Sequence, residues 1–176
     1  MKKIFFLAAA MLLTLAASAE VIPANDSRVT YVGRTQVIDN TVSFDWTATY
    51  FRIAFSGNSL TMRASDTKWD ATPEMAAKRH NYYNVWIDSP TSAEPHRIIE
   101  VAGNDTVIEL IDPAYLKKSR RAVHEVIVQK RTEGEQGKTT IHEFATDGKF
   151  FQADPLKSRQ LEFIGDSYTC GYGIDA

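Results

Sequence analysis

A serine lies in a glycine-rich stretch, GDSYTCGYG, at residues 165–173. The apolar run LEFI (161–164) precedes it and predicts a short strand, after which Gly165 allows a sharp turn. Ser167 is then expected just past the strand end, where a helix would begin. A serine hydroxyl there can act as a nucleophile if a base accepts its proton, and its own N–H can stabilise an oxyanion. Ser167 is therefore the candidate catalytic residue.

Plainer interpretations of this stretch stay open. A Gly-Asp-Ser turn can also simply cap a helix. Asp166 is more typical of a turn former than of an acid, because neighbouring side chains normally point in different directions. Cys170 is the single cysteine and cannot form an intramolecular disulfide. Arg159, the nearest cation in sequence, is eleven positions away, so we expect Cys170 to be a packing residue rather than a reactive thiol.

The spacing of the glycines distinguishes two hydrolase classes. The elbow G-x-S-x-G would need a glycine where this chain has Thr169, which disfavours an α/β-hydrolase. The block FIGDSYTCGYG (163–173) resembles the first block of SGNH or GDSL-like hydrolases, and among them carbohydrate esterase family 2, whose usual form is close to IEFIGDSITCGYG. The upstream segments YVGR (31–34), YFRIAFSGNSLTMRASD (50–66) and HEVIVQKRTEG (124–134) are similar to the N-terminal domain of that family.

The resemblance implies a two-part enzyme. A jelly-roll β-sandwich, similar to a carbohydrate-binding module, would precede an α/β/α hydrolase domain that removes acetyl groups from plant polysaccharides such as xylan or mannan. Ser167 matches the family's nucleophile, and its amide would form part of the oxyanion hole. A glycine and an asparagine from later blocks complete that hole, and a histidine in an Asp-x-x-His segment acts as base. The resemblance implies no metal and no organic cofactor.

The chain departs from this pattern because the later blocks are absent from its 176 residues. Its histidines, His80, His96, His124 and His142, all lie upstream, and none follows an aspartate at the required spacing. We therefore expect an N-terminal part of the enzyme, inactive alone. The alternative is a non-catalytic carbohydrate-binding sandwich.

Residues 1–19 have the pattern of a signal peptide. Lys2 and Lys3 precede an apolar run, and Ala17-Ser18-Ala19 is a small-residue cleavage site. The sequence predicts cleavage after Ala19, secreted or periplasmic localisation, and no membrane association after cleavage.

The composition of the chain argues against nucleic acid as a partner. The formal net charge of −2 gives no basic footprint for nucleic acid, and oligomeric state is not indicated.

We expect one sandwich domain with its linker at residues 20–155, and the truncated start of a hydrolase domain at residues 156–176. The polar stretch QADPLKSRQ (152–160) suits a linker.

Short alternating segments between Arg28 and Phe144 predict the antiparallel sandwich independently of the resemblance. The segments YFRIAF (50–55) and LTMRA (60–64) flank a Gly-Asn turn and predict a hairpin; RIIEV (97–101) and TVIELI (106–111) lie at hairpin distance. Further strands are expected at 28–32, 41–46, 83–88, 124–130 and 139–144. Thr72-Pro73 and Asp112-Pro113 predict two short helices.

Five aromatic residues invite a sugar-stacking role: Trp46, Trp69, Tyr82, Tyr83 and Trp86. Alternation places Tyr83 on the core face of its strand and Tyr82 and Trp86 on the outer face. Tyr82, Trp86 and Trp69, the last in a polar loop, are the preferred substrate-binding candidates, although aromatic residues are also ordinary core residues in sandwiches.

Overall fold

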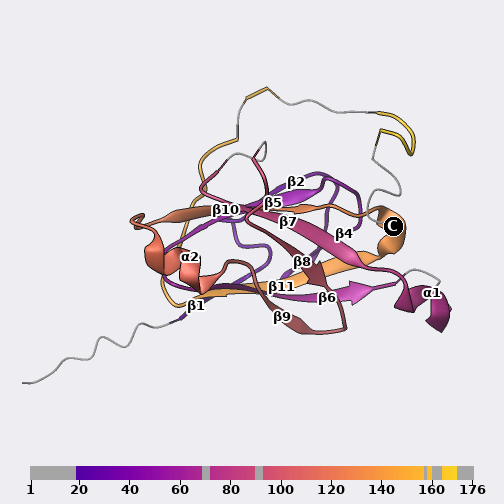
Figure 1. Ribbon diagram of the computed structural model, residues 1–176, viewed down its shortest axis with the longest axis horizontal. Helices are drawn as coiled ribbons and strands as arrows, with labels where there is room; N and C mark the ends of the chain where they lie inside the picture. The colour runs from indigo at the N-terminus through magenta and orange to yellow at the C-terminus, as the bar shows by residue number, and fades with distance from the viewer. Residues whose placement is uncertain (1–18, 69–71, 90–92, 157, 160–163, 170–176) are drawn as a thin grey trace, which may run out of the picture.

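Two antiparallel sheets pack face to face in the computed structural model, which describes residues 19–68, 72–89, 93–156, 158–159 and 164–169 (Figure 1). The first sheet contains β1 (Glu20–Pro23), β3 (Gln36–Ile38), β4 (Thr41–Phe44), β6 (Leu60–Thr67), β9 (Thr106–Glu109) and β11 (Lys138–Thr146). The second contains β2 (Thr30–Val32), β5 (Tyr50–Phe55), β7 (Asn81–Ile87), β8 (Arg97–Val101), β10 (His124–Lys130) and β12 (Phe150–Phe151). The predicted antiparallel sandwich is confirmed.

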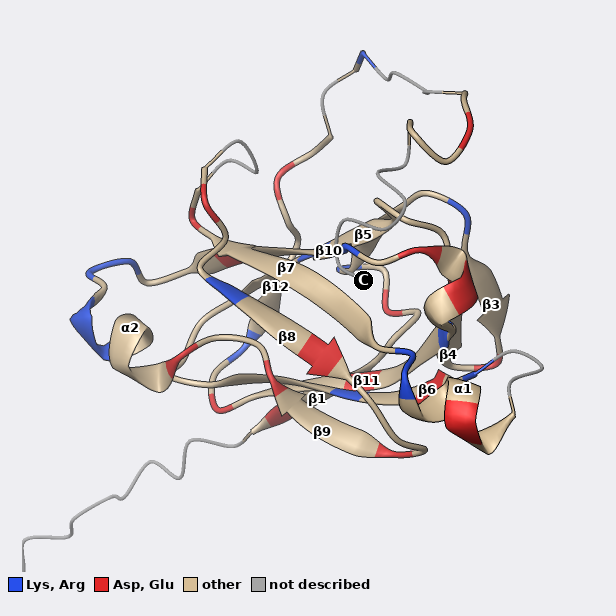
Figure 2. Ribbon diagram, turned by 45° about the vertical axis from the view of Figure 1, so that its right-hand side comes forward, with Lys and Arg blue, Asp and Glu red and all other residues tan. Residues whose placement is uncertain are grey.

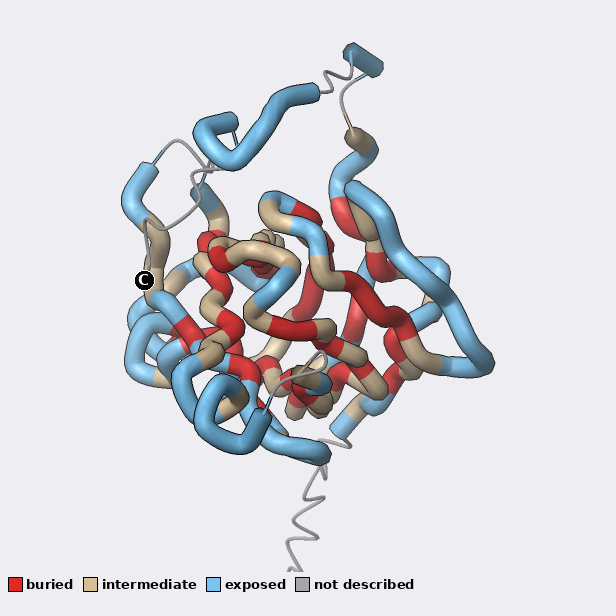
Figure 3. The backbone as a smooth tube through the Cα atoms, turned by 90° about the vertical axis from the view of Figure 1, so that its right-hand side faces the viewer, coloured by how far each residue is buried: buried red, intermediate tan, exposed pale blue. Residues whose placement is uncertain are grey.

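Strand order places β11 and β10 at the centres of the two sheets. The first sheet runs β3-β4-β11-β6-β9, and β1 also pairs with β11. The second runs β12-β5-β10-β7-β8, and β2 also pairs with β5. In β10, Val126 lies between Ile53 of β5 and Ile87 of β7. Figure 3 shows the buried residues in the middle of the molecule, with exposed residues around them.

Alternation along the strands builds the core. Phe51, Ile53 and Phe55 of β5 are fully buried, as the two-residue period predicts. The inward residues of β6 and β7 are buried in the same way: Leu60, Met62, Ala64, Tyr83, Val85 and Ile87. Burial of this apolar surface is the main favourable contribution to folding.

The two predicted hairpins are wrong. β5 and β6 belong to different sheets, and so do β8 and β9, so each turn crosses between the layers. A two-residue alternation reports one buried face but does not say whether the next strand lies beside the first or opposite it. The side chain of Asp147, in the turn after β11, accepts hydrogen bonds from the N–H groups of Asn58 (2.6 Å) and Ser59 (3.1 Å).

Both predicted helices are present and short. α1 (Pro73–Ala77) has Thr72 as its N-cap, and α2 (Pro113–Lys118) has Asp112. Each cap side chain accepts a backbone N–H of the first turn. Neither helix covers a sheet (Figure 1). The described residues include no helix that is long and apolar enough to cross a membrane.

The chain leaves the sandwich across the second sheet. Ala153 is buried, and the N–H of Asp154 donates to Glu125 Oε2 at 3.0 Å. Residues 164–169, yellow in Figure 1, lie above this sheet and are exposed. We call residues 164–169 the serine turn.

Candidate functional site

Three segments from distant parts of the sequence meet around one cavity. The cavity has a volume of about 710 Å³ and is lined by residues 45–48, by residues 133–135, and by Gly165, Asp166 and Thr169 of the serine turn. We call it the end cavity. Its volume lies within the range of roughly 300–1,000 Å³ that is usual for small-molecule sites.

The serine turn is organised by Asp166. The N–H of Tyr168 donates to Asp166 Oδ1 at 3.0 Å, and the N–H of Thr169 donates to the Asp166 carbonyl at 3.1 Å. Asp166 is thus a turn former, as predicted. A Cβ at Gly165 would lie 1.9 Å from Thr169 Oγ1, so a larger residue there would require the Thr169 side chain to move. Ser167 is exposed on the turn; Asp166 and Thr169 line the end cavity, whereas Ser167 and Tyr168 are not among its lining residues.

Residues 45–48 form another wall of the end cavity, and together with Thr49 we call them the Trp46 loop. Backbone and side-chain hydrogen bonds join this loop to the end of β10 and to the residues that follow it. The N–H of Ala48 donates to the Lys130 carbonyl at 2.9 Å, and the N–H of Lys130 donates to the Thr49 carbonyl at 2.8 Å. Thr47 Oγ1 donates to the Thr132 carbonyl at 3.2 Å. Ala48 has φ of 65°, a left-handed conformation that is costly for a residue with a Cβ.

A buried lysine holds the third wall. The Lys130 side chain is 1% exposed, and its ammonium donates to Asn81 Oδ1, to Thr132 Oγ1 at 3.1 Å and to the Glu133 carbonyl at 3.3 Å. Burial lowers the pKa of Lys130 to about 8. The ammonium therefore fixes residues 132 and 133, where the chain turns toward the end cavity.

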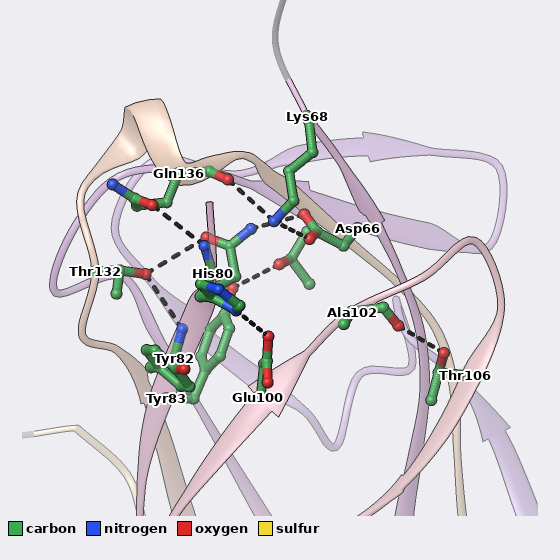
Figure 4. A network of polar contacts seen from close by, with 12 residues as sticks. Asp66, Lys68, His80, Tyr82, Tyr83, Glu100, Ala102, Thr106, Thr132 and Gln136 are labelled. Atoms are coloured by element: carbon green, nitrogen blue, oxygen red, sulfur yellow. Dashed lines mark hydrogen bonds and ion pairs between the residues drawn. The ribbon is translucent and has the colours of Figure 1, made fainter. Parts of the chain in front are cut away.

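A second lysine extends this polar network, part of which Figure 4 shows. The ammonium of Lys68 pairs with the buried carboxylate of Asp66 and donates to the Gln136 carbonyl at 3.2 Å. Asn81 Nδ2 donates to the other oxygen of Asp66 at 2.7 Å. The N–H of His80 donates to Gln136 Oε1 at 3.2 Å. Strands β6, β7 and β10 are thereby joined to the turn at residues 132–137.

The sugar-binding role predicted for Trp86 needs correction. Its side chain does lie on the outer face of β7, opposite Ile127, but it is only 4% exposed. The indole N–H donates to the Ala93 carbonyl at 2.8 Å, so the segment that contains Ala93 covers it. A ring must be exposed to stack on a sugar, so Trp86 is a packing residue in this structure.

The other aromatic candidates have different outcomes. Tyr82 is half-buried on the outer face and stacks on His80, with ring centres 5.7 Å apart. Tyr83 lies in the core, as predicted. Trp69 lies outside the described residues.

Trp46 was one of the five aromatic candidates of the sequence but not one of the three preferred ones. It is 56% exposed and lines the end cavity. Its alternation with Val42 and Phe44 is typical of a core position. Strand β4 ends at Phe44, however, and the left-handed Ala48 turns the chain, so the pattern does not continue to Trp46.

Each of the four histidines contacts another residue of the sandwich. His124 pairs with the buried Asp88 at 2.7 Å, and His80 with Glu100 at 2.6 Å. His142 Nε2 lies 2.7 Å from Ser65 Oγ. His96 packs against Tyr115, and its burial, with the positive charge of Arg97, lowers its pKa. None of the described residues that line the end cavity is a histidine.

The fold and this site define a β-sandwich domain that carries a serine-containing turn at one end. The family model for the carbohydrate esterase 2 N-terminal domain matches residues 31–155. The chain therefore belongs to carbohydrate esterase family 2, as its sequence predicted.

Curated relatives agree with this family. Two proteins of Cellvibrio japonicus (strain Ueda107), each named acetylxylan esterase / glucomannan deacetylase, are 30% and 26% identical to the chain. The first match covers 74% of this chain and 30% of the relative; the second covers 92% and 40%. The chain thus spans less than half the length of the curated relatives it matches.

Solved structures show the same fold. A family two carbohydrate esterase from Cellvibrio japonicus superposes with a TM-score of 0.70 at 23% identity, over 88% of this chain and 41% of that one. A carbohydrate esterase family 2 enzyme from Corynascus thermopiles (Myceliophthora fergusii) gives 0.60 at 30% identity, over 84% and 38%. A family two carbohydrate esterase from Clostridium thermocellum, solved in complex with cellohexaose, gives 0.65 at 23% identity, over 82% and 39%.

Proposed function

We propose that this chain is the N-terminal part of an exported esterase that removes acetyl groups from plant polysaccharide, with Ser167 as its nucleophile. The observation that carries the proposal is the end cavity, where the serine turn faces loops of a sandwich that belongs to carbohydrate esterase family 2. The names of the two curated relatives support acetylated xylan and glucomannan as substrates. Strand β1 begins at Glu20, the first residue after the predicted cleavage site, which fits export.

The reaction follows from the chemistry of a serine beside an ester. The Ser167 hydroxyl attacks the acetyl carbonyl while a base takes its proton, and the backbone N–H of Ser167 donates to the oxyanion. The bond between the carbonyl carbon and the sugar oxygen then breaks, and the sugar leaves as an alcohol with that proton. Water attacks the acetyl-serine, and acetate and free Ser167 are regenerated.

The base is proposed to come from the later blocks of the family, which these 176 residues do not contain. Each histidine of the sandwich is on a strand or loop outside the described lining of the end cavity. The chain alone is therefore expected to release no acetate, whereas the full-length gene product is expected to be active.

Acetate release from acetylated xylan and acetylated glucomannan tests this proposal. In the full-length gene product, Ser167→Ala is expected to lower turnover by at least about a thousandfold. Ser158→Ala, in the linker, is the matched control and is expected to keep wild-type turnover. Equal rates for wild type and Ser167→Ala would show that another group performs the chemistry.

A further inference from the structure

A second, smaller cavity adjoins the end cavity. It has a volume of about 260 Å³, and its lining includes Arg34, Gln36 and Lys138. We call it the side cavity. Asp45 and Trp46 line both cavities, so the two hollows meet at these residues. The two cavities therefore lie side by side, one at the serine turn and one at the start of β11, and we call them together the groove.

From this continuity we propose that the sandwich itself binds substrate: the groove holds the main chain of a neutral polysaccharide, with Trp46 as the stacking platform. The ligand class rests on the proposed function, because the polymer that carries the acetyl group must extend beyond the serine turn. The position of the groove and of Trp46 follows from the structure of the sandwich and does not depend on the proposed function.

Trp46 has the surroundings of a platform rather than of a core residue. The guanidinium of Arg34 lies 4.6 Å from the centre of its ring. Arg34 lines only the side cavity, so the cation contacts the indole on that side, while Trp46 also borders the end cavity. Sugar rings present apolar C–H faces, and a flat aromatic ring offers a large contact area at low conformational cost.

The Trp46 loop is also fixed before any ligand binds. Ala48 keeps its left-handed conformation because backbone hydrogen bonds join both sides of the loop to Lys130. Strained backbone of this kind gathers at ligand sites, where the surrounding structure enforces it. A preorganised platform loses less entropy on binding than a mobile one.

The charges of the end cavity favour a neutral chain over an acidic one. The end cavity carries four carboxylates, Asp45, Glu133, Glu135 and Asp166, whereas Arg34 and Lys138 line the side cavity. Figure 2 shows acidic residues on the short turn beside β3, at the end of the sandwich opposite α2. Carboxylates at this wall repel an acidic polysaccharide but not a neutral xylan or mannan chain.

Calorimetric titration of the full-length gene product with xylohexaose and mannohexaose tests the groove. Wild type is expected to bind at least one of them, and Trp46→Ala to lose about tenfold in affinity. Trp46→Phe is expected to keep part of that affinity, and hexagalacturonate is expected not to bind. Tyr115→Ala removes another exposed aromatic residue (37%), on α2 at the other end of the sandwich, and is expected to bind as wild type does.

Three results would overturn the groove: no binding of either neutral hexasaccharide, equal affinity in Trp46→Ala and wild type, or preferred binding of hexagalacturonate. Thermal unfolding of each variant shows that its fold is intact. Hydrolysis of p-nitrophenyl acetate by wild type, abolished in Ser167→Ala, reports on the proposed function separately. Trp46-dependent binding without hydrolysis would refute the proposed esterase function alone. Hydrolysis without Trp46-dependent binding would refute the groove alone.

Discussion

The backbone N–H of Ala48 donates to the carbonyl of Lys130 at 2.9 Å, at the point where the side chain of Lys130 turns into the core. Lys130 therefore supports two walls of the end cavity. Its backbone holds the Trp46 loop, and its ammonium holds Thr132 and the Glu133 carbonyl. An intact network is a condition for the shape of the candidate site.

Lys130→Met is expected to destabilise the protein. Methionine fills a similar volume but leaves Asn81 Oδ1 and Thr132 Oγ1 without the ammonium donor. An unsatisfied buried polar group costs about 1–3 kcal/mol, and we expect a loss in that range from chemical denaturation. Lys149→Met, at an exposed site, is the control and is expected to change stability by less than about 0.5 kcal/mol. Equal stability of the two variants would refute the structural role of Lys130.

The pKa of Lys130 also predicts a pH dependence. The folded chain releases the proton of Lys130 at about pH 8, whereas the unfolded chain keeps it to about 10.4. Between these values the unfolded chain binds more protons, so the contribution of Lys130 to stability rises with pH. The free energy of unfolding of wild type relative to Lys130→Met should therefore be larger at pH 9.5 than at pH 7. A flat or falling difference would contradict the lowered pKa.

The crossings between sheets predict unequal effects of two glycine substitutions. Gly57 has φ of 113°, and a Cβ there would lie 2.3 Å from Asp147 Oδ1 and 2.8 Å from the Gly148 nitrogen. Gly103 has φ of 83°, with only Thr106 Oγ1 near its Cβ position, at 3.1 Å. Gly103→Ala is expected to cost about 1 kcal/mol for its left-handed backbone alone. Gly57→Ala should cost clearly more, and thermal or denaturant unfolding of both variants checks the order.

Trp86→Ala separates packing from sugar binding. Because the ring is buried and donates to Ala93, its removal is expected to cost about 3 kcal/mol of stability. Affinity for neutral hexasaccharides per folded molecule is expected to stay at the wild-type value. A loss of affinity in a variant that remains fully folded would restore Trp86 as a binding residue.

Sequence patterns predicted the sandwich because alternation reports which side chains face the core. They also predicted both helix caps, since Thr72-Pro73 and Asp112-Pro113 are local signals. They could not predict which sheet each strand joins, because β5 and β6 alternate alike whether they pair or face each other. Short strands such as β3, whose Val37 and Ile38 are exposed, gave too weak a pattern.

The site was predictable only in part. The block around Ser167 indicated the serine turn, but not the loops opposite it, which come from residues far away in sequence. Lys130 carried a usable signal: it continues the inward face of Val126 and Val128, where a lysine is unusual and needs buried partners. The signal at Trp46 was misleading. Its two-residue spacing from Val42 and Phe44 predicted a core position, but strand β4 ends at Phe44.

Labelling of the full-length gene product with diethyl p-nitrophenyl phosphate, followed by mass mapping of its peptides, tests whether Ser167 is the nucleophile. Activated serine nucleophiles react with this reagent, so we expect one diethylphosphoryl group on Ser167 together with loss of acetate release. Ser65, which lies 2.7 Å from His142 Nε2, is the rival serine within the sandwich. A label on Ser65, or inactivation without a label on Ser167, would show that Ser167 is not the nucleophile.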